Sequence, residues 1–82
     1  MEMKVKVHTF LRVRSAPSLE APSVDALPNK TVVNVTEQQG EWSKISAYSF
    51  DGYVFSPCDN NSWVYTKYLR KRWRFPFLKL DI

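Results

Sequence analysis

The chain has 82 residues, of which 44% are hydrophobic and 15% aromatic, and Cys58 is its one cysteine. This length accommodates one hydrophobic core and excludes a second domain, and a lone cysteine excludes an internal disulfide. Residues 1–66 hold six basic and seven acidic side chains, a net charge of −1, whereas residues 67–82 hold six basic and one acidic, a net charge of +5. The positive charge is therefore concentrated at the C-terminal end.

The N-terminal half predicts three extended segments and a long loop. Residues 4–7 alternate lysine with valine, which places the valines on the buried face of a strand. Residues 10–14 continue extended, but prolines in residues 15–26 predict a loop, because proline cannot donate to a strand ladder. Residues 31–36 are rich in β-branched side chains and predict a further strand.

Asp51-Gly52 lies between two apolar runs and is the strongest local pattern in the chain. Such a dipeptide predicts a type I′ turn and therefore a hairpin with a two-residue loop. Strand parity then gives the hairpin two apolar faces. One face carries five rings, Trp42, Tyr48, Phe50, Tyr53 and Phe55, and the opposite face presents Ile45, Ala47 and Val54 to the interior. The ring face requires a cover, which is either a partner or the chain's own tail through Trp73, Phe75 and Phe77.

Residues 63–66 predict one more short strand, after a polar loop over residues 56–61 and before a turn at Tyr68-Leu69. No segment shows the apolar repeat of an amphipathic helix. Short strands without helices indicate an all-β fold, a small barrel or a sandwich.

Five segments together carry a resemblance to a known family. The run Leu11-Arg12-Val13-Arg14-Ser15-Ala16-Pro17-Ser18 resembles the opening of bacterial SH3 (SH3b) domains. Later family segments are matched in the expected order by Val24–Leu27, Thr31–Val35, Trp42–Ile45 and Trp63–Leu69. Departures are Ala16, Lys30 and Ser62, each at a position where the family has glycine, and a longer stretch over residues 47–61.

The resemblance implies an all-β, small SH3-like barrel of about five short strands over residues 1–69. Residues 70–82 would form an extended basic-aromatic C-terminal segment, packed on the barrel or on a partner. SH3b domains are generally noncatalytic modules that bind cell-wall peptides or protein segments. Matched by position, Trp42 corresponds to the aromatic residue at the edge of the family's groove, Arg14 to Ser18 to the start of the adjacent loop, and Tyr68 to the aromatic residue after the last strand.

We therefore expect a noncatalytic binding or adaptor module that recognises a protein or peptide partner through an aromatic groove. The candidate ligand-binding residues are Arg14, Pro17, Trp42, Tyr48, Phe50, Tyr53, Phe55 and Tyr68, and the basic tail adds Arg70, Lys71, Arg72, Trp73 and Arg74. The alternatives are a peptidoglycan-binding module, a homodimer joined by the ring face, and nucleic-acid binding through the tail. A nearly neutral body disfavours nucleic acid.

Catalysis, metals and cofactors have little support in the sequence. His8 is the only histidine and has no evident acid or base partner, and metal-ligand spacing of cysteine and histidine is lacking. With Gly40 and Gly52 as the only glycines, a glycine-rich phosphate loop is also lacking. We therefore expect no enzymatic activity, no metal and no cofactor. No apolar run reaches the ~20 residues of a membrane span. Residues 1–7 do not resemble a signal peptide, which predicts a cytoplasmic location.

Overall fold

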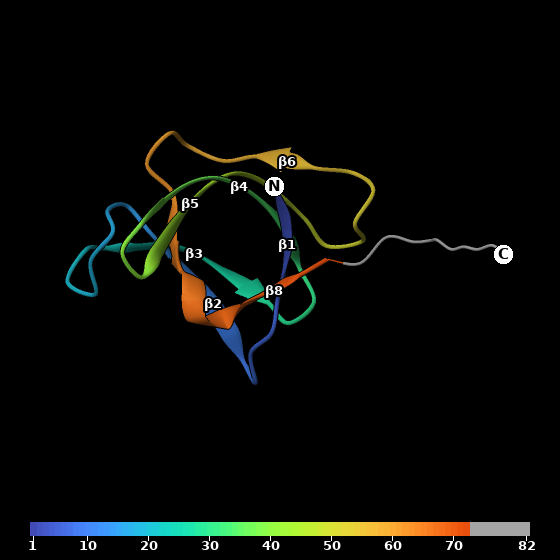
Figure 1. Ribbon diagram of the computed structural model, residues 1–82, viewed down its shortest axis with the longest axis horizontal. Coiled ribbons are helices and arrows are strands. Elements are labelled where there is room, and N and C mark those ends of the chain that lie inside the picture. Colours follow the sequence, from blue (N-terminus) through green and yellow to red (C-terminus); the bar gives the residue numbers. More distant parts are fainter. Residues whose placement is uncertain (73–82) are drawn as a thin grey trace, which may run out of the picture.

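Antiparallel strands make up most of residues 1–72, the part of the chain that this computed structural model describes (Figure 1). The order in the sheet is β3-β2-β7-β5-β4-β1-β8, and the short β6 pairs with β5. The elements are β1 (Glu2–Val5), β2 (Phe10–Arg14), β3 (Ser23–Pro28), β4 (Val32–Gln39), β5 (Trp42–Ser49), β6 (Ser56–Pro57), β7 (Trp63–Tyr65), the 3-10 turn η1 (Thr66–Tyr68) and β8 (Leu69–Lys71).

The all-β prediction is confirmed, and the predicted strands at residues 10–14, 31–36 and 63–66 correspond to β2, β4 and β7. Residues 1–72 form eight strands, more than the predicted five or so, because short strands at the edges of the sheet add to it. β3 is one of these, and its first four residues lie in the segment predicted as a loop. It begins directly after Pro22 and pairs only with β2. Most of its side chains are exposed, so it lacks the apolar alternation that identifies a strand.

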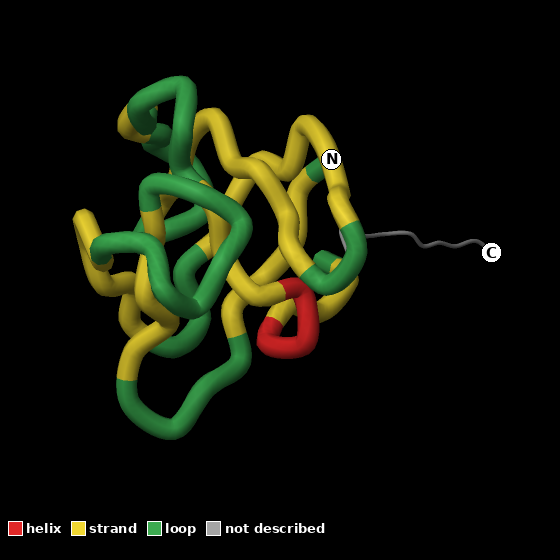
Figure 2. Tube along the Cα trace, turned by 90° about the vertical axis from the view of Figure 1, so that its left-hand side faces the viewer, coloured by secondary structure: helices red, strands yellow, loops and turns green. Residues whose placement is uncertain are grey.

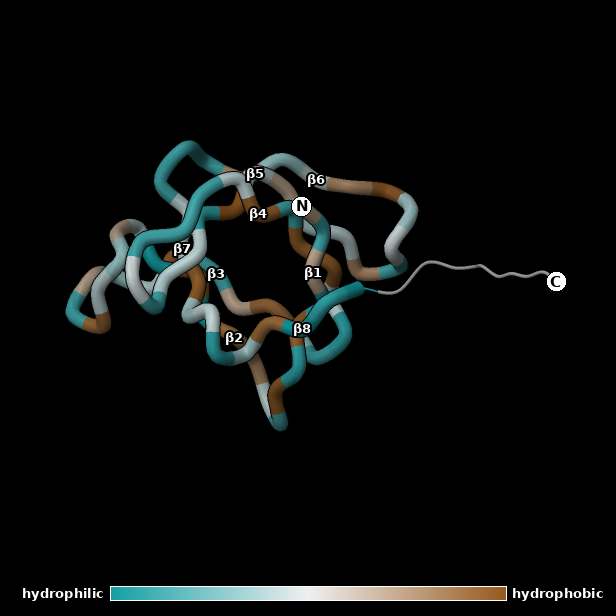
Figure 3. Tube along the Cα trace, in the orientation of Figure 1, coloured by the Kyte–Doolittle hydropathy of each residue, from teal (hydrophilic) through white to brown (hydrophobic). Residues whose placement is uncertain are grey.

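The interior of the barrel is filled by aliphatic side chains that alternate along the strands. Hydrophobic positions, brown in Figure 3, recur along the strands that surround this interior. Its buried members are Val5, Leu11, Val13, Leu27, Val33, Val35, Ile45, Val64 and Leu69. They come from seven strands, so no pair of neighbouring strands holds the core alone. Figure 2 shows η1 as a helical turn that carries the chain from β7 into β8.

The two-faced arrangement of rings predicted for residues 42–55 is wrong, and a bulge in β5 is the reason. Val35 pairs with Ile45 and Val33 with Tyr48, so three residues of β5 are spanned by two of β4. Directly paired residues project to the same face of a sheet, and Val33 and Val35 are both in the core. Ile45 and Tyr48 therefore share the interior face, and Tyr48 packs against the core. A bulge reverses the parity on which the prediction relied.

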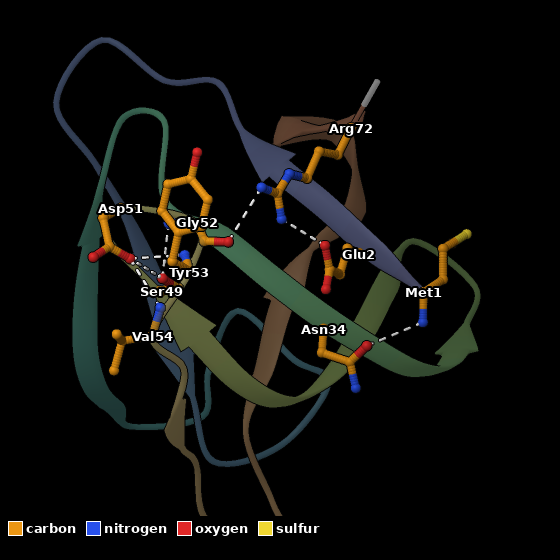
Figure 4. Close-up of polar contacts among 9 residues, drawn as sticks. All are labelled: Met1, Glu2, Asn34, Ser49, Asp51, Gly52, Tyr53, Val54 and Arg72. Atoms are coloured by element: carbon orange, nitrogen blue, oxygen red, sulfur yellow. Dashed lines mark hydrogen bonds and ion pairs between the residues drawn. The ribbon is translucent and has the colours of Figure 1, made fainter. Parts of the chain in front are cut away.

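The predicted two-residue hairpin at Asp51-Gly52 is also wrong. A type I′ turn needs positive φ at both central residues, and here Gly52 has φ 82° whereas Asp51 does not lie in that region. Instead, the Asp51 carboxylate accepts hydrogen bonds from the amides of Tyr53 and Val54, at 2.8 and 3.0 Å (Figure 4). This carboxylate-capped turn opens a wider loop before β6. Val54, which was predicted to be interior, lies in this loop and is 73% exposed.

Candidate ligand-binding groove

Three aromatic rings stand in a row on the outside of the barrel. Trp42 in β5 and Tyr65 in β7 are direct cross-strand partners, with ring centroids 5.3 Å apart at an interplanar angle of 72°. The next pair along, Ser43 and Val64, is buried, so the Trp42–Tyr65 pair faces outward. Tyr68, at the end of η1, continues the row with its ring centroid 6.0 Å from that of Tyr65. Edge-to-face and tilted ring pairs at these distances are mutually stabilising.

The row of rings forms one wall of a hollow of about 320 Å³. Phe10, Leu11, Arg12 and Arg14 of β2 and Leu19 of the β2–β3 loop complete its lining. The Arg14 guanidinium donates a hydrogen bond to the carbonyl of Ala21 at 2.9 Å, which ties the end of β2 to the far side of that loop. The hollow is therefore bounded by fixed strands on one side and by an anchored loop on the other.

Two further hollows extend this one in opposite directions and make a continuous groove. Toward β1, Phe10 and Tyr68 are shared with a hollow of about 620 Å³ that Lys6, His8, Asn29 and Arg70 also line. Toward the β4–β5 turn, a hollow of about 570 Å³ shares Leu19, Trp42 and Tyr65 and is also lined by Glu20 and Glu41. The groove therefore has an aromatic middle that also carries Arg12 and Arg14, a cationic end and an acidic end.

Hydrogen bonds fix the acidic end. The Tyr65 hydroxyl donates to the Glu41 carboxylate, and the Glu41 carbonyl accepts from the Thr66 amide at 2.8 Å. The bond to the carboxylate, followed by burial, raises the pKa of Tyr65 above its ordinary value, so the phenol stays protonated and keeps its donor role. Glu41 is therefore held beside the rings by both its side chain and its backbone.

The structure brings together only part of the predicted site. Trp42, Tyr68 and Arg14 line the groove, whereas Pro17 lies in the β2–β3 loop and lines none of its three hollows. The remaining predicted rings lie elsewhere: Tyr48 packs on the core beside Phe50, with ring centroids 5.3 Å apart, and Tyr53 and Phe55 belong to the loop after β5. Among these, Phe50 is 65% and Tyr53 86% exposed.

Sequence analysis missed five residues that line the central hollow: Phe10, Leu11, Arg12, Leu19 and Tyr65. Trp42 begins β5 and Tyr65 ends β7, and the antiparallel pairing of these two strands brings the two rings together. The sequence did not indicate that register. Leu19 was hidden because nothing in a proline-bounded loop indicates which way its one large apolar side chain points.

The structure describes only the first three residues of the predicted basic tail. Arg70 and Lys71 are in β8, which pairs with β1, so sheet pairing continues past residue 69. Arg72 donates to the Glu2 carboxylate at 2.5 Å and to the Gly52 carbonyl at 3.2 Å, which ties the end of β8 to β1 and to the Asp51 turn (Figure 4). Trp73 and Arg74, and the predicted tail contacts of Phe75 and Phe77, lie outside the described residues.

The described part of the chain shows no metal site, no membrane-spanning helix and no activated thiol. Residues 1–72 contain no group of three or more histidine, cysteine or carboxylate side chains that could hold a metal ion. No helix in that range is long and apolar enough to cross a membrane. Partial burial raises the pKa of the Cys58 thiol, and nearby Asp25 and Asp59 raise it further, so the reactive thiolate is disfavoured.

Comparison with known proteins gives one match. The family model for the bacterial SH3 domain matches residues 9–70, which include β2 to β7 and the start of β8. Neither the curated proteins nor the solved structures contain a match. The matched range includes Trp42, Tyr65 and Tyr68, the whole ring row of the groove.

Proposed function

Since the chain belongs to the bacterial SH3 domain family, whose members are generally binding modules, we propose that it is a noncatalytic adaptor that binds an extended protein or peptide segment. The binding surface in this proposal is the groove over Trp42, Tyr65 and Tyr68. The row formed by these three rings is the observation that carries the proposal.

The ring row suits an extended chain better than a compact ligand. Its rings follow one another in contact, at centroid distances of 5.3 and 6.0 Å, so together they present one continuous apolar surface along the groove. Successive apolar side chains or prolines of an extended peptide can pack on such a surface, as in other aromatic-lined peptide grooves. The Tyr68 hydroxyl can also bond the peptide backbone, and the Tyr65 hydroxyl, which donates to Glu41, can accept from a peptide amide.

Peptidoglycan is the second candidate ligand, and the family assignment favours it. Its peptide stems are short and extended, so they would use the same rings as a protein segment. The two candidates differ in the physical form of the ligand, because peptidoglycan is an insoluble polymer whereas a protein segment is soluble. Sedimentation with purified peptidoglycan therefore separates them.

The test is a selection of binders from a random peptide library displayed on phage, with the whole chain as bait. Selected peptides are then synthesised and titrated by fluorescence anisotropy against the wild type, Trp42→Ala and Tyr53→Ala. Trp42→Ala should weaken binding by about 10-fold or more, since central aromatic anchors dominate such interfaces. Tyr53→Ala is the matched control, because Tyr53 is 86% exposed and lies outside the groove.

Stability and outcome are judged together. Urea unfolding checks that each variant folds, and Trp42→Phe, which keeps a ring, should retain most of the affinity. If the Trp42→Ala variant folds and binds as tightly as the wild type, the groove is not the binding surface. If no peptide is enriched and the chain sediments with peptidoglycan in a Trp42-dependent manner, the ligand is peptidoglycan and not a protein segment.

A further inference from the structure

Four cationic side chains, here called the basin, surround a hollow of about 360 Å³ beside β1 and β8. They are Lys4, Lys6, Lys30 and Arg70, which come from β1, the segment after it, the β3–β4 turn and β8. The register of β1 and β8 sets Lys4 directly opposite Arg70. The remaining lining consists of Val5 and Asn29, so within the described chain no carboxylate faces this hollow.

This arrangement opposes folding in two ways. Like charges directly opposite each other on paired strands repel, as Lys4 and Arg70 do. Lys30 also adopts φ 75°, a left-handed conformation that is unfavourable for a residue with a side chain. Within residues 1–72 no salt bridge offsets these costs, since the one salt bridge found there joins Arg72 to Glu2. Strain and unpaired charge concentrated at one place are typical of a binding site.

The basin opens into the cationic end of the groove. Lys6, Asn29 and Arg70 line both the basin and the hollow that contains Phe10 and Tyr68. Arg70 is oriented there by hydrogen bonds from its guanidinium to the carbonyls of Lys67 and Leu69, at 2.8 and 2.9 Å. A guanidinium has five N–H donors, so others remain for a ligand. The basin and the ring row are thus parts of one surface.

We infer that the ligand of the groove is a peptide with an acidic segment, which binds in the basin while its adjoining apolar residues pack on the rings. This inference rests on the proposed function and adds the chemistry and direction of the ligand. Charge complementarity places carboxylates beside Lys4, Lys6, Lys30 and Arg70. The acidic end of the groove sets the polarity, because a chain that is anionic throughout would meet Glu20 and Glu41 there. A nucleic-acid strand is anionic throughout and matches the surface less well.

The same peptide selection tests the inference through the charge of its products. The enriched sequences should carry aspartate or glutamate on one side of an apolar core. Lys4→Gln and Arg70→Gln should each weaken the binding of such a peptide by about 2- to 5-fold, the range of an exposed ion pair. Binding should also weaken as salt rises. Lys44→Gln is the matched control: it removes one positive charge from β5, where Lys44 lies over the Trp63 ring and lines neither the groove nor the basin.

A charge-reversed chain gives the sharpest comparison. Lys4→Glu combined with Arg70→Glu should shift the selected peptides from acidic to basic, with the apolar core unchanged. Peptides that need Trp42 but show no acidic bias would overturn the inference and leave the proposed function standing. Failure of the whole chain to bind any peptide would overturn both. Tighter, basin-dependent binding of a single-stranded oligothymidine than of the acidic peptide would overturn the inference in favour of nucleic acid.

Discussion

Replacement of Lys30 by glycine should stabilise the fold and weaken ligand binding at the same time. The left-handed conformation at φ 75° costs a residue with a side chain about 1–2 kcal/mol. Glycine avoids that cost but loses about 0.5–1 kcal/mol more conformational entropy on folding. The middles of these two ranges give a net gain of about 0.75 kcal/mol, which in a domain of this size raises Tm by about 3–6 °C. The Lys30 amide donates to the Val5 carbonyl at 2.8 Å, a bond that glycine keeps.

Lys30→Ala isolates the strain from the charge. It removes the same ammonium group but keeps a β-carbon, so it should gain none of the stability that glycine gains. Thermal and urea unfolding followed by circular dichroism measure both variants, and anisotropy with an acidic peptide should show an equal, about 2- to 5-fold loss of affinity for each. If the glycine variant is no more stable than the alanine variant, the left-handed conformation at Lys30 does not destabilise the fold.

Four further variants test the loop and the core. Gly52→Ala should cost about 1–2 kcal/mol in unfolding free energy, because Gly52 has φ 82° and its new β-carbon would lie 2.8 Å from Nη2 of Arg72. Asp51→Asn should remove a part of the acid dependence of stability. Hydrogen bonds from the loop amides hold the Asp51 pKa at about 2, below its ordinary 3.8, so the wild type has this stabilisation above pH 3.8 and loses it as pH falls through 2. Ile45→Val should cost about 0.5–1.5 kcal/mol, whereas Val54→Ala should change stability by less than about 0.5 kcal/mol.

Each of these outcomes has a clear opposite. An undiminished stability of Gly52→Ala would contradict the left-handed turn, and Arg72→Ala reports how much of any loss comes from the broken Arg72 contacts. Identical acid unfolding curves for Asp51→Asn and the wild type would contradict the carboxylate-capped turn. If Val54→Ala lowers the unfolding free energy by more than Ile45→Val does, Val54 is buried and its exposed position is contradicted. Urea unfolding at a series of pH values measures all four variants.

The all-β fold class was predictable because apolar alternation and β-branched residues are local properties of the sequence. Val5, Val33 and Val64 are all buried, within segments that sequence analysis predicted as strands. The face on which Tyr48 lies was not predictable, because it depends on a bulge that inserts one residue between Ile45 and Tyr48. Nothing in the local sequence marks that insertion, and a single extra residue moves every later side chain to the other face.

The groove was predicted in part for a similar reason. Trp42, Tyr68 and Arg14 were identified through the family resemblance, and all three line the groove. The basin was not predicted, because it joins positions 4, 6, 30 and 70, which the chain brings together only through the pairing of β1 with β8 and the turn at Lys30. Counting charge along the sequence assigned the positive field to the tail and concealed this cluster within a nearly neutral body.

Amide chemical shifts on addition of a selected acidic peptide to the isotopically labelled whole chain test the groove most directly. The shifts should trace one path, from Lys30 and Lys6 past Tyr68 to Tyr65 and the indole of Trp42. The amides of the loop around Tyr53 should not move. Shifts centred on that loop, with the indole of Trp42 unchanged, would contradict peptide binding in the groove.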